Sequence, residues 1–181
     1  MKYIILLRGV NISGKNKISM TELKKEVEDI GYHDAFIYLN SGNLIVNSDK
    51  ERTEVFNEIK NLLKDKFNLD IPMVIITLDE LEIILSKKPD WWETNNKEIY
   101  DNIIFMTEET DVKEVLDTIG EPTGNIDKIL PIDNAIFWSF DLKNYRKSSW
   151  WIKTASTSIK DKLTIRTGNT LKKIVELCKK D

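Results

Sequence analysis

The sequence predicts an α+β protein made of two similar units in tandem. Two observations carry this prediction: the same order of strand-like and helix-like segments occurs twice, and a polar stretch with Pro89 separates the copies. The chain has 181 residues, enough for two domains of about 80–90 residues each. We therefore expect an N-terminal domain over residues 1–92 and a C-terminal domain over residues 93–181.

The first half predicts a strand, a helix, a hairpin, a helix, a strand and a further short helix. Residues 3–8 are apolar and β-rich, and residues 20–30 place apolar side chains at helical spacing between Ser19, a capping residue, and Gly31. Strand-like segments flank Ser41-Gly42-Asn43, as in a hairpin. A helix over 51–67, a strand over 72–77 and a short helix capped by Asp79 complete the unit.

The second half repeats this order. Residues 99–107 predict a strand, 110–120 a helix ending at Gly120, and 127–140 a hairpin around Asp133-Asn134. A cationic segment, 143–160, is expected to be partly helical, and a strand over 162–167 leads into a last helix capped by Asn169 or Thr170. Since β-α-β-β-α-β is the split βαβ order, we predict two tandem ferredoxin-like domains.

The charge is unevenly distributed along the chain. The net charge is −3, but residues 1–21 carry +4, residues 142–181 carry +8 and the middle carries −15. If the two ends meet in space, they form a positive surface on an acidic body. A pI near 5.4 argues against a general nucleic-acid coat protein.

Composition also excludes several classes of site and location. No apolar run approaches the roughly 18–20 residues of a membrane span. One cysteine, Cys178, allows no intrachain disulfide, so we expect a reducing cytoplasm. His33 is the only histidine, which excludes a histidine-based metal cluster, and we predict no cofactor and no metal.

The stretch LRGVNISGKNKISM comes within one residue of a Walker A loop. Gly9, Gly14 and Lys15 have the required spacing, but Asn16 stands where a Mg²⁺-binding hydroxyl belongs. The best helix cap, Ser19, also comes several residues too late. The stretch therefore argues against a nucleotide triphosphatase.

A less demanding role remains for this stretch. A loop with glycines, Arg8, Lys15 and Lys17 and no carboxylate is suited to an anion. Its asparagines are equally suited to hydrogen-bonding the loop's own backbone, and both interpretations stay open.

The stretch TIRTGNT, residues 164–170, is a second compact polar site. Arg166 is expected at the end of a strand, beside the N-terminus of the last helix, where an anion is favoured. The alternative interpretation is a plain helix cap with one arginine at a strand end.

Two tryptophan pairs allow two interpretations. Trp91-Trp92 follow a Pro-Asp turn, and Trp150-Trp151 lie within the cationic segment. Aromatic rings among cations are suited to stacking on bases while neutralising phosphates. Rings of this size more often cover a small core.

Three stretches together resemble a known family. LLRGVNISGKNKISMTELK, YLNSGNLIV and LTIRTGNTLKKIVEL are similar to the signature stretches of domain-of-unknown-function family 1697, a bacterial family. Thr167 departs from the asparagine that relatives often have after the last motif's arginine. The resemblance implies tandem ferredoxin-like α+β domains and no known activity. The motif positions carried over are Arg8, Gly9, Asn11, Gly14, Asn16, Ser41, Gly42, Asn43, Thr164, Arg166, Asn169 and Thr170.

Three functions remain open. The first is binding of a phosphate-bearing ligand, a nucleotide or RNA, with the motifs at 8–17, 41–43 and 164–170 converging on it. The second is a small-molecule enzyme acting on a phosphorylated substrate. Against it, none of the three motifs contains a carboxylate that could act as a base. The third is a structural or regulatory interaction protein, in which the motif asparagines are used up by backbone hydrogen bonds. The predicted ligand-binding residues are Arg8, Asn11, Lys15, Asn16, Ser41, Asn43, Arg166, Asn169 and Thr170.

Overall fold

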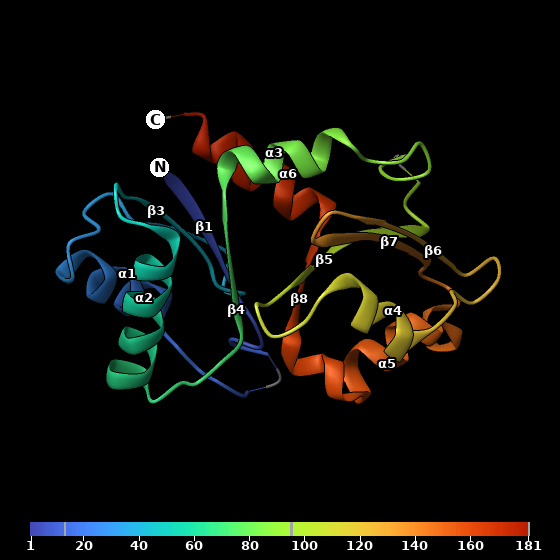
Figure 1. The fold of residues 1–181 in the computed structure, drawn as a ribbon, viewed down its shortest axis with the longest axis horizontal. Helices are drawn as coiled ribbons and strands as arrows, with labels where there is room; N and C mark the ends of the chain where they lie inside the picture. The colour runs from blue at the N-terminus through green and yellow to red at the C-terminus, as the bar shows by residue number, and fades with distance from the viewer. Residues whose placement is uncertain (13, 95, 181) are drawn as a thin grey trace. The chain divides into compact units, whose positions relative to one another are not determined.

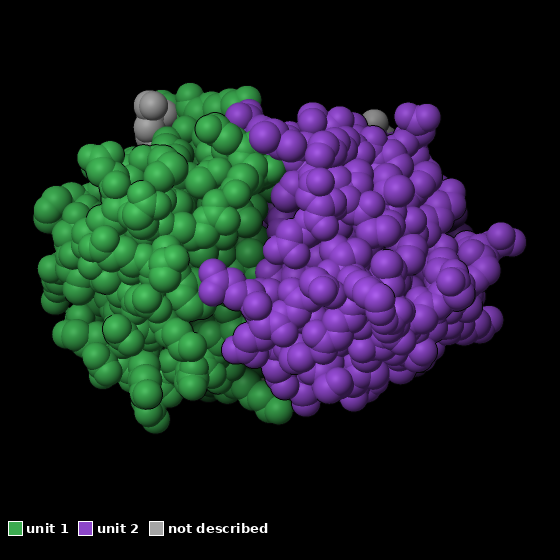
Figure 2. Space-filling model, in the orientation of Figure 1, with its two compact units in different colours: residues 1–81, 177–181 green, residues 82–176 purple. Residues whose placement is uncertain are grey.

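In the computed structural model the chain divides into two compact units (Figure 2). Unit 1 comprises Met1–Leu81 with Leu177–Asp181, and unit 2 comprises Glu82–Glu176. The structure describes residues 1–12, 14–94 and 96–180. Each unit contains one four-stranded antiparallel sheet with helices, which confirms the α+β class. The domain ranges 1–92 and 93–181 stay a prediction.

Unit 1 is built on a sheet whose strand order is β2-β3-β1-β4 (Figure 1). β1 pairs antiparallel with both β3 and β4, so that Ile5 lies opposite Leu44 on one side and Ile75 on the other. The elements of this half of the chain are β1 (Lys2–Leu7), α1 (Met20–Asp29), β2 (Phe36–Tyr38), β3 (Asn43–Asn47), α2 (Arg52–Phe67), β4 (Met73–Thr77) and α3 (Leu78–Ser86).

The core of unit 1 lies between one face of this sheet and the helices α1 and α2. Tyr3, Ile5 and Leu7 of β1 belong to one buried cluster with Leu23 of α1 and Ile59 of α2. Residues on the other face of β1 are buried too, which explains why the strand reads as a continuous apolar run without alternation.

Unit 2 has the sheet order β6-β7-β5-β8. β5 lies between β7 and β8, and Ile104 faces Ile136 on one side and Ile165 on the other. The elements of this half are β5 (Ile99–Met106), α4 (Val112–Ile119), β6 (Asp127–Ile132), β7 (Ala135–Asp141), the 3₁₀ turn η1 (Tyr145–Lys147), α5 (Ser149–Ser156), η2 (Ser158–Lys162), β8 (Leu163–Thr167) and α6 (Gly168–Cys178).

The core of unit 2 packs α4 and α5 against its sheet. Val115 of α4 and Trp150 of α5 belong to one buried cluster with Ile104, Ile136 and Trp138. The indole of Trp150 donates to the carbonyl oxygen of Gly120 at 3.1 Å, so its polar atom is satisfied at the edge of the core.

The sequence predicts a cap residue for α1, α3 and α6, and the structure agrees at α1 and differs at α3 and α6. Ser19 caps α1 by accepting from the amide of Glu22, as predicted. α3 begins before Asp79, and the hydroxyl of Thr77 accepts from the amide of Glu80. α6 begins at Gly168, and Thr167 accepts from the amide of Thr170. Both differences have one cause: a strand-end threonine provides a cap oxygen one or more residues earlier than expected.

The stretch around Pro89 also differs from a simple linker. Trp92 is only 2% exposed and packs edge-on against Phe137 at a ring-centroid distance of 5.0 Å. Its indole nitrogen donates to the carbonyl oxygen of Asn102. This aromatic side chain is therefore part of the core of unit 2.

Candidate functional site

The loop between β1 and α1 is held in place by its own asparagine side chains. Gly9, Asn11, Gly14 and Asn16 all have φ between +45° and +77°. The side-chain Nδ2 of Asn11 donates to the carbonyl oxygens of Ile18 at 2.9 Å and Asn40 at 3.1 Å. The Oδ1 of the same side chain accepts from the backbone amide of Ile18. Hydrogen bonds with the backbone thus use both ends of this side-chain amide.

The hairpin motif 41–43 is held in the same way. Asn43 is fully buried, and its Nδ2 donates to the carbonyl oxygen of Tyr38 and to the hydroxyl of Ser41. The carbonyl oxygen of Gly42 accepts from the amide of Leu7, at the end of β1. A Cβ at Gly42 would lie 2.9 Å from that of Leu7, so only glycine fits. Side-chain atoms of unit 1's two motifs therefore fix its loops.

A hollow of about 530 Å³ lies beside the first loop. It is lined by Asn11, Gly14, Lys17, Ile18 and Ser19. Of the predicted ligand residues in unit 1, Asn11 lines it, whereas Lys15 and Asn16 are exposed elsewhere on the loop. The Nδ2 of Asn16 donates to the carbonyl oxygen of Gly9 at 3.1 Å, across the loop.

The last motif begins within the sheet of unit 2. Arg166 of β8 is 8% exposed and lies opposite Ile103 of β5. Its Nη1 donates to the hydroxyl of Thr164 at 2.8 Å and to the carbonyl oxygen of Ile165 at 2.9 Å. The hydroxyls of Thr167 and Thr170 bond each other at 2.9 Å, and Thr170 supports the helix cap. Asn169, in contrast, is exposed.

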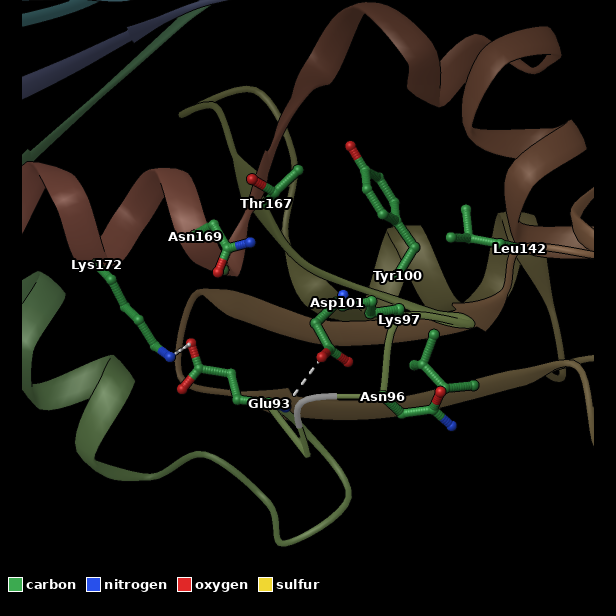
Figure 3. A pocket seen from close by; sticks show the side chains of 11 residues that line it. Glu93, Asn96, Lys97, Tyr100, Asp101, Leu142, Thr167, Asn169 and Lys172 are labelled. Atoms are coloured by element: carbon green, nitrogen blue, oxygen red, sulfur yellow. Dashed lines mark hydrogen bonds and ion pairs between the residues drawn. The ribbon is translucent and has the colours of Figure 1, made fainter.

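Asn169 lines a pocket of about 580 Å³ at the N-terminus of α6 (Figure 3). The pocket lies wholly within unit 2. Its walls are the segment that precedes and opens β5, Leu142 after β7, and the start of α6. The polar and aromatic residues that line it are Asn96, Lys97, Tyr100, Thr167, Asn169 and Lys172, together with the carboxylates Glu93 and Asp101.

Both carboxylates of this pocket are engaged with protein groups. Glu93 lies between two lysines, with Oε2 2.9 Å from Nζ of Lys88 and Oε1 2.7 Å from Nζ of Lys172. Asp101 accepts from the amide of Glu93 at 3.0 Å and from the hydroxyl of Ser139. Figure 3 shows the contacts of Glu93 with Lys172 and Asp101.

Gly168 allows the close packing of the pocket's inner wall. A Cβ at this position would lie 2.8 Å from Cη2 of Trp92 and 3.2 Å from Oε1 of Glu93. The start of α6 therefore packs directly against the buried indole of Trp92 and the side chain of Glu93.

Sequence reasoning missed the residues between 93 and 101. The sequence predicts a polar stretch that separates the two domains, and it contains no carboxylate within the three motifs, whereas the structure places Glu93 and Asp101 in the same pocket as Thr167 and Asn169. The available signal was the Trp91-Trp92 pair, because a large ring in an apparent linker indicates that the segment is packed.

The structure brings some predicted residues together within each unit. In unit 1 the side chain of Asn11 in the first loop donates to the carbonyl oxygen of Asn40, the residue before the hairpin motif. Arg8 belongs to unit 1, and Arg166 and Asn169 belong to unit 2. The convergence of all three motifs on one ligand stays a prediction.

Two further features bear on function. In the part of the chain that the structure describes, three or more metal-binding side chains do not gather anywhere. Across that same part, every helix is too short or too polar to cross a bilayer.

Comparisons with known proteins agree with the fold and leave the activity open. The chain is similar to the structure of a conserved bacterial protein from Streptococcus pneumoniae, with 26% identity, a TM-score of 0.87 and 98% of each chain covered. A search of the curated proteins found no match. The family model described as "Protein of unknown function (DUF1697)" matches residues 1–137, which include the first two signature stretches. The chain therefore belongs to the DUF1697 family of proteins of unknown function.

Proposed function

We propose that unit 2 binds a phosphate-bearing small molecule of the nucleotide class in the pocket at the N-terminus of α6. The observation that carries this proposal is the position of Asn169, an exposed amide at the helix start that lines the pocket. The first amides of a helix have no partner within it, and the helix dipole favours negative charge there. Phosphate oxygens match both properties.

Charges and rings around the pocket support the same ligand class. Lys97 is exposed and makes no hydrogen bond or ion pair with any residue that the structure describes. Tyr100, at 40% exposure, offers a ring beside it. The lysines that hold Glu93 reduce the repulsion between that carboxylate and an anion. Lys97 and Asn169 are therefore assigned to the phosphate, and Tyr100 to the base.

Titration calorimetry of the full chain tests this proposal. Wild type is titrated with AMP, ATP, adenosine and inorganic phosphate. We expect Asn169→Ala and Lys97→Ala each to weaken AMP binding by about tenfold, since each removes a charge-assisted contact. Lys60→Ala, an exposed lysine of α2, is the matched control and should bind as wild type does. Absence of binding in wild type, or wild-type affinity in both pocket variants, would contradict the proposal.

The proposal also includes predicted ligand residues that do not line this pocket. Arg8, Lys15 and Ser41 of unit 1 and Arg166 of unit 2 are expected to contribute charge or hydrogen bonds to a phosphate-bearing ligand, each within its own unit. Arg8→Ala and Arg166→Ala, titrated at several salt concentrations, test that contribution. Wild-type affinity in both variants would limit the site to the pocket at the N-terminus of α6.

A second candidate is a structural or regulatory interaction protein. It is favoured by Asn11 and Asn43, whose side-chain amides bond loop groups within unit 1. On this interpretation the motifs maintain loop shape, and no nucleotide or phosphate ester binds to the chain.

An enzymatic role has gained one supporting observation. The objection that no carboxylate accompanies the motifs does not hold in space, because Glu93 and Asp101 line the same pocket as Asn169. A screen of phosphoester substrates with wild type and Asp101→Asn separates this role from binding alone. Turnover that disappears in the variant, with folding intact, would establish it.

We also propose a finer fold assignment and a location. The orders β2-β3-β1-β4 and β6-β7-β5-β8, each with two intervening helical connections, support ferredoxin-like units. The single cysteine and the similar protein from Streptococcus pneumoniae support a bacterial cytoplasmic protein.

A further inference from the structure

Four aromatic side chains form a continuous row in unit 2. Tyr100 contacts Phe140 at a ring-centroid distance of 5.4 Å, Phe140 contacts Trp151 at 5.3 Å, and Trp151 contacts Tyr145 at 5.0 Å. We call these four residues the aromatic row. Phe140 is buried and belongs to the core, so the row is anchored at its centre.

Two members of the row are open to solvent. Trp151 is 41% exposed and Tyr100 is 40% exposed. The exposure of Trp151 follows from its position after Trp150 in α5, because the side chains of consecutive helix residues point about 100° apart. Trp150 fills the core, and its neighbour is left on the outer face of α5, next to the exposed Ile152. A partly exposed ring that is braced by other rings offers a rigid stacking surface.

Cations without acidic partners lie at the Tyr145 end of the aromatic row. The guanidinium of Arg146 lies over the ring of Tyr145 at 5.7 Å, and its Nε donates to the Tyr145 hydroxyl at 3.1 Å. Arg146 and Lys147 form no ion pair with any carboxylate in the described ranges. Glu98, which precedes β5, is paired with Lys143.

We propose that the aromatic row, with Arg146 and Lys147, binds single-stranded nucleic acid. A base stacks on Trp151, and successive phosphates meet the two cations. Unpaired cations beside braced rings favour this partner over an apolar protein surface, which would leave the charges buried and unmatched. In a duplex, base faces are not available to an outer ring. This role goes beyond the proposed function because it requires no ligand in the pocket.

The acidic net charge of the protein shapes the expected binding. A chain with a net charge of −3 has no general attraction for nucleic acid. Association must then depend on a local surface with few phosphate contacts, so the affinity should be moderate and should fall as salt increases.

Fluorescence anisotropy of a labelled oligouridine of about 12 nucleotides tests the proposal at low salt. We expect wild type to bind, and Trp151→Ala to lose about tenfold or more in affinity, because one base–ring stack is removed. Trp151→Phe retains a ring and should recover most of the loss. Ile152→Ala removes an equally exposed apolar group from the same helix and is the matched control, with wild-type affinity expected.

The salt dependence separates stacking from charge. Arg146→Ala with Lys147→Ala should reduce the slope of log K against log salt by about 1.4, because two phosphate contacts are lost. Trp151→Ala should leave that slope unchanged. A wild-type protein that does not bind the oligomer, or a Trp151→Ala protein that binds as wild type does, would overturn the proposal. Unfolding curves for each variant ensure that lost binding is not lost structure.

Discussion

Single side-chain amides determine the shape of the first signature loop. Turn asparagines can bind a ligand or their own backbone, and the sequence left these alternatives open. The contacts of Asn11 and Asn43 show the second use, since their amide groups bond neighbouring loop oxygens and hydrogens. At residue scale these two asparagines therefore hold loop backbone in place.

Asn11→Ala should lower the free energy of unfolding by about 2 kcal/mol. The change removes the acceptor of the Ile18 amide and places alanine at a φ of 56°. Urea denaturation measures the effect. Asn11→Gly relieves the backbone strain, so a similar loss there assigns the effect to the amide.

Lys15→Ala is the matched control in the same loop, because Lys15 is exposed. It should change stability by less than about 0.5 kcal/mol. Equal stability of Asn11→Ala and wild type would remove the structural role of the motif.

Gly168→Ala should destabilise unit 2 by about 1–3 kcal/mol, since the new methyl group overlaps the ring of Trp92. The ring is buried and cannot move aside without opening a cavity. Thermal or urea unfolding gives the size of the effect. Asn169→Ala, one position further along the same helix, adds no such overlap and serves as the control. A variant as stable as wild type would contradict this prediction, because it would show that Trp92 and the start of α6 accommodate the methyl group at little cost in free energy.

At the scale of elements, helix starts are determined by residues that also end strands. Thr77 closes β4 and caps α3, and Thr167 closes β8 and caps α6. At α3 the bond is reciprocal, because Oε2 of Glu80 accepts from the amide of Thr77 at 2.8 Å. This capping box joins strand and helix without an intervening loop.

The capping box is also linked to α2 by charge. Glu80 accepts from the Arg52 guanidinium at 2.5 Å. Partial burial raises the pKa of this carboxyl group, but the hydrogen bonds from Arg52 and the Thr77 amide outweigh burial, and the net pKa is lowered from its ordinary 4.5. A lowered folded-state pKa stabilises the fold above the unfolded-state pKa and loses that contribution as pH falls through the folded value.

Glu80→Gln should therefore be less stable than wild type at neutral pH, and the difference should shrink as pH falls below about 4.5. Glutamine keeps one acceptor oxygen for the Thr77 amide, and it loses the negative charge and the second acceptor that faces Arg52. Urea denaturation at a series of pH values measures the difference. Asp79→Asn removes an exposed carboxylate from the same turn and is the control for the loss of one negative charge. A difference between Glu80→Gln and wild type that does not vary with pH would contradict the assignment.

At the scale of the whole molecule, the chain forms two units with separate buried clusters. All five tryptophans lie between residues 91 and 151 and therefore in unit 2. Tryptophan fluorescence reports on the tertiary packing of unit 2, whereas far-UV circular dichroism reports on the helices and strands of both units.

Asn11→Ala should shift part of the circular dichroism transition to lower urea and leave the fluorescence transition in place. The reason is that the variant weakens a loop of unit 1, and a domain with its own core can unfold as its own cooperative unit. Gly168→Ala provides the converse comparison and should shift the fluorescence transition. Equal shifts of both signals in both variants would mean that the whole chain unfolds in one step.

The sequence by itself determined the repeated order of elements, and with it the α+β class. It did so because hydrophobic period and turn residues are local properties that tertiary contacts here leave unchanged. It also indicated that Ser19 begins α1, as the hydrogen bond from the Glu22 amide to the Ser19 hydroxyl confirms. This conclusion needed only neighbours a few residues away.

Only the tertiary structure decided which polar groups share a pocket and which tryptophan of each pair is buried. The pocket joins residues near 93–101, 142 and 167–172, and no local pattern places such distant segments together. Trp91 and Trp92, like Trp150 and Trp151, have the same chemistry, and burial of one of each pair follows from the direction in which the packed backbone points it. The proposed ligand site depends on which side chains are neighbours in space, because a ligand contacts side chains in space and not in sequence order.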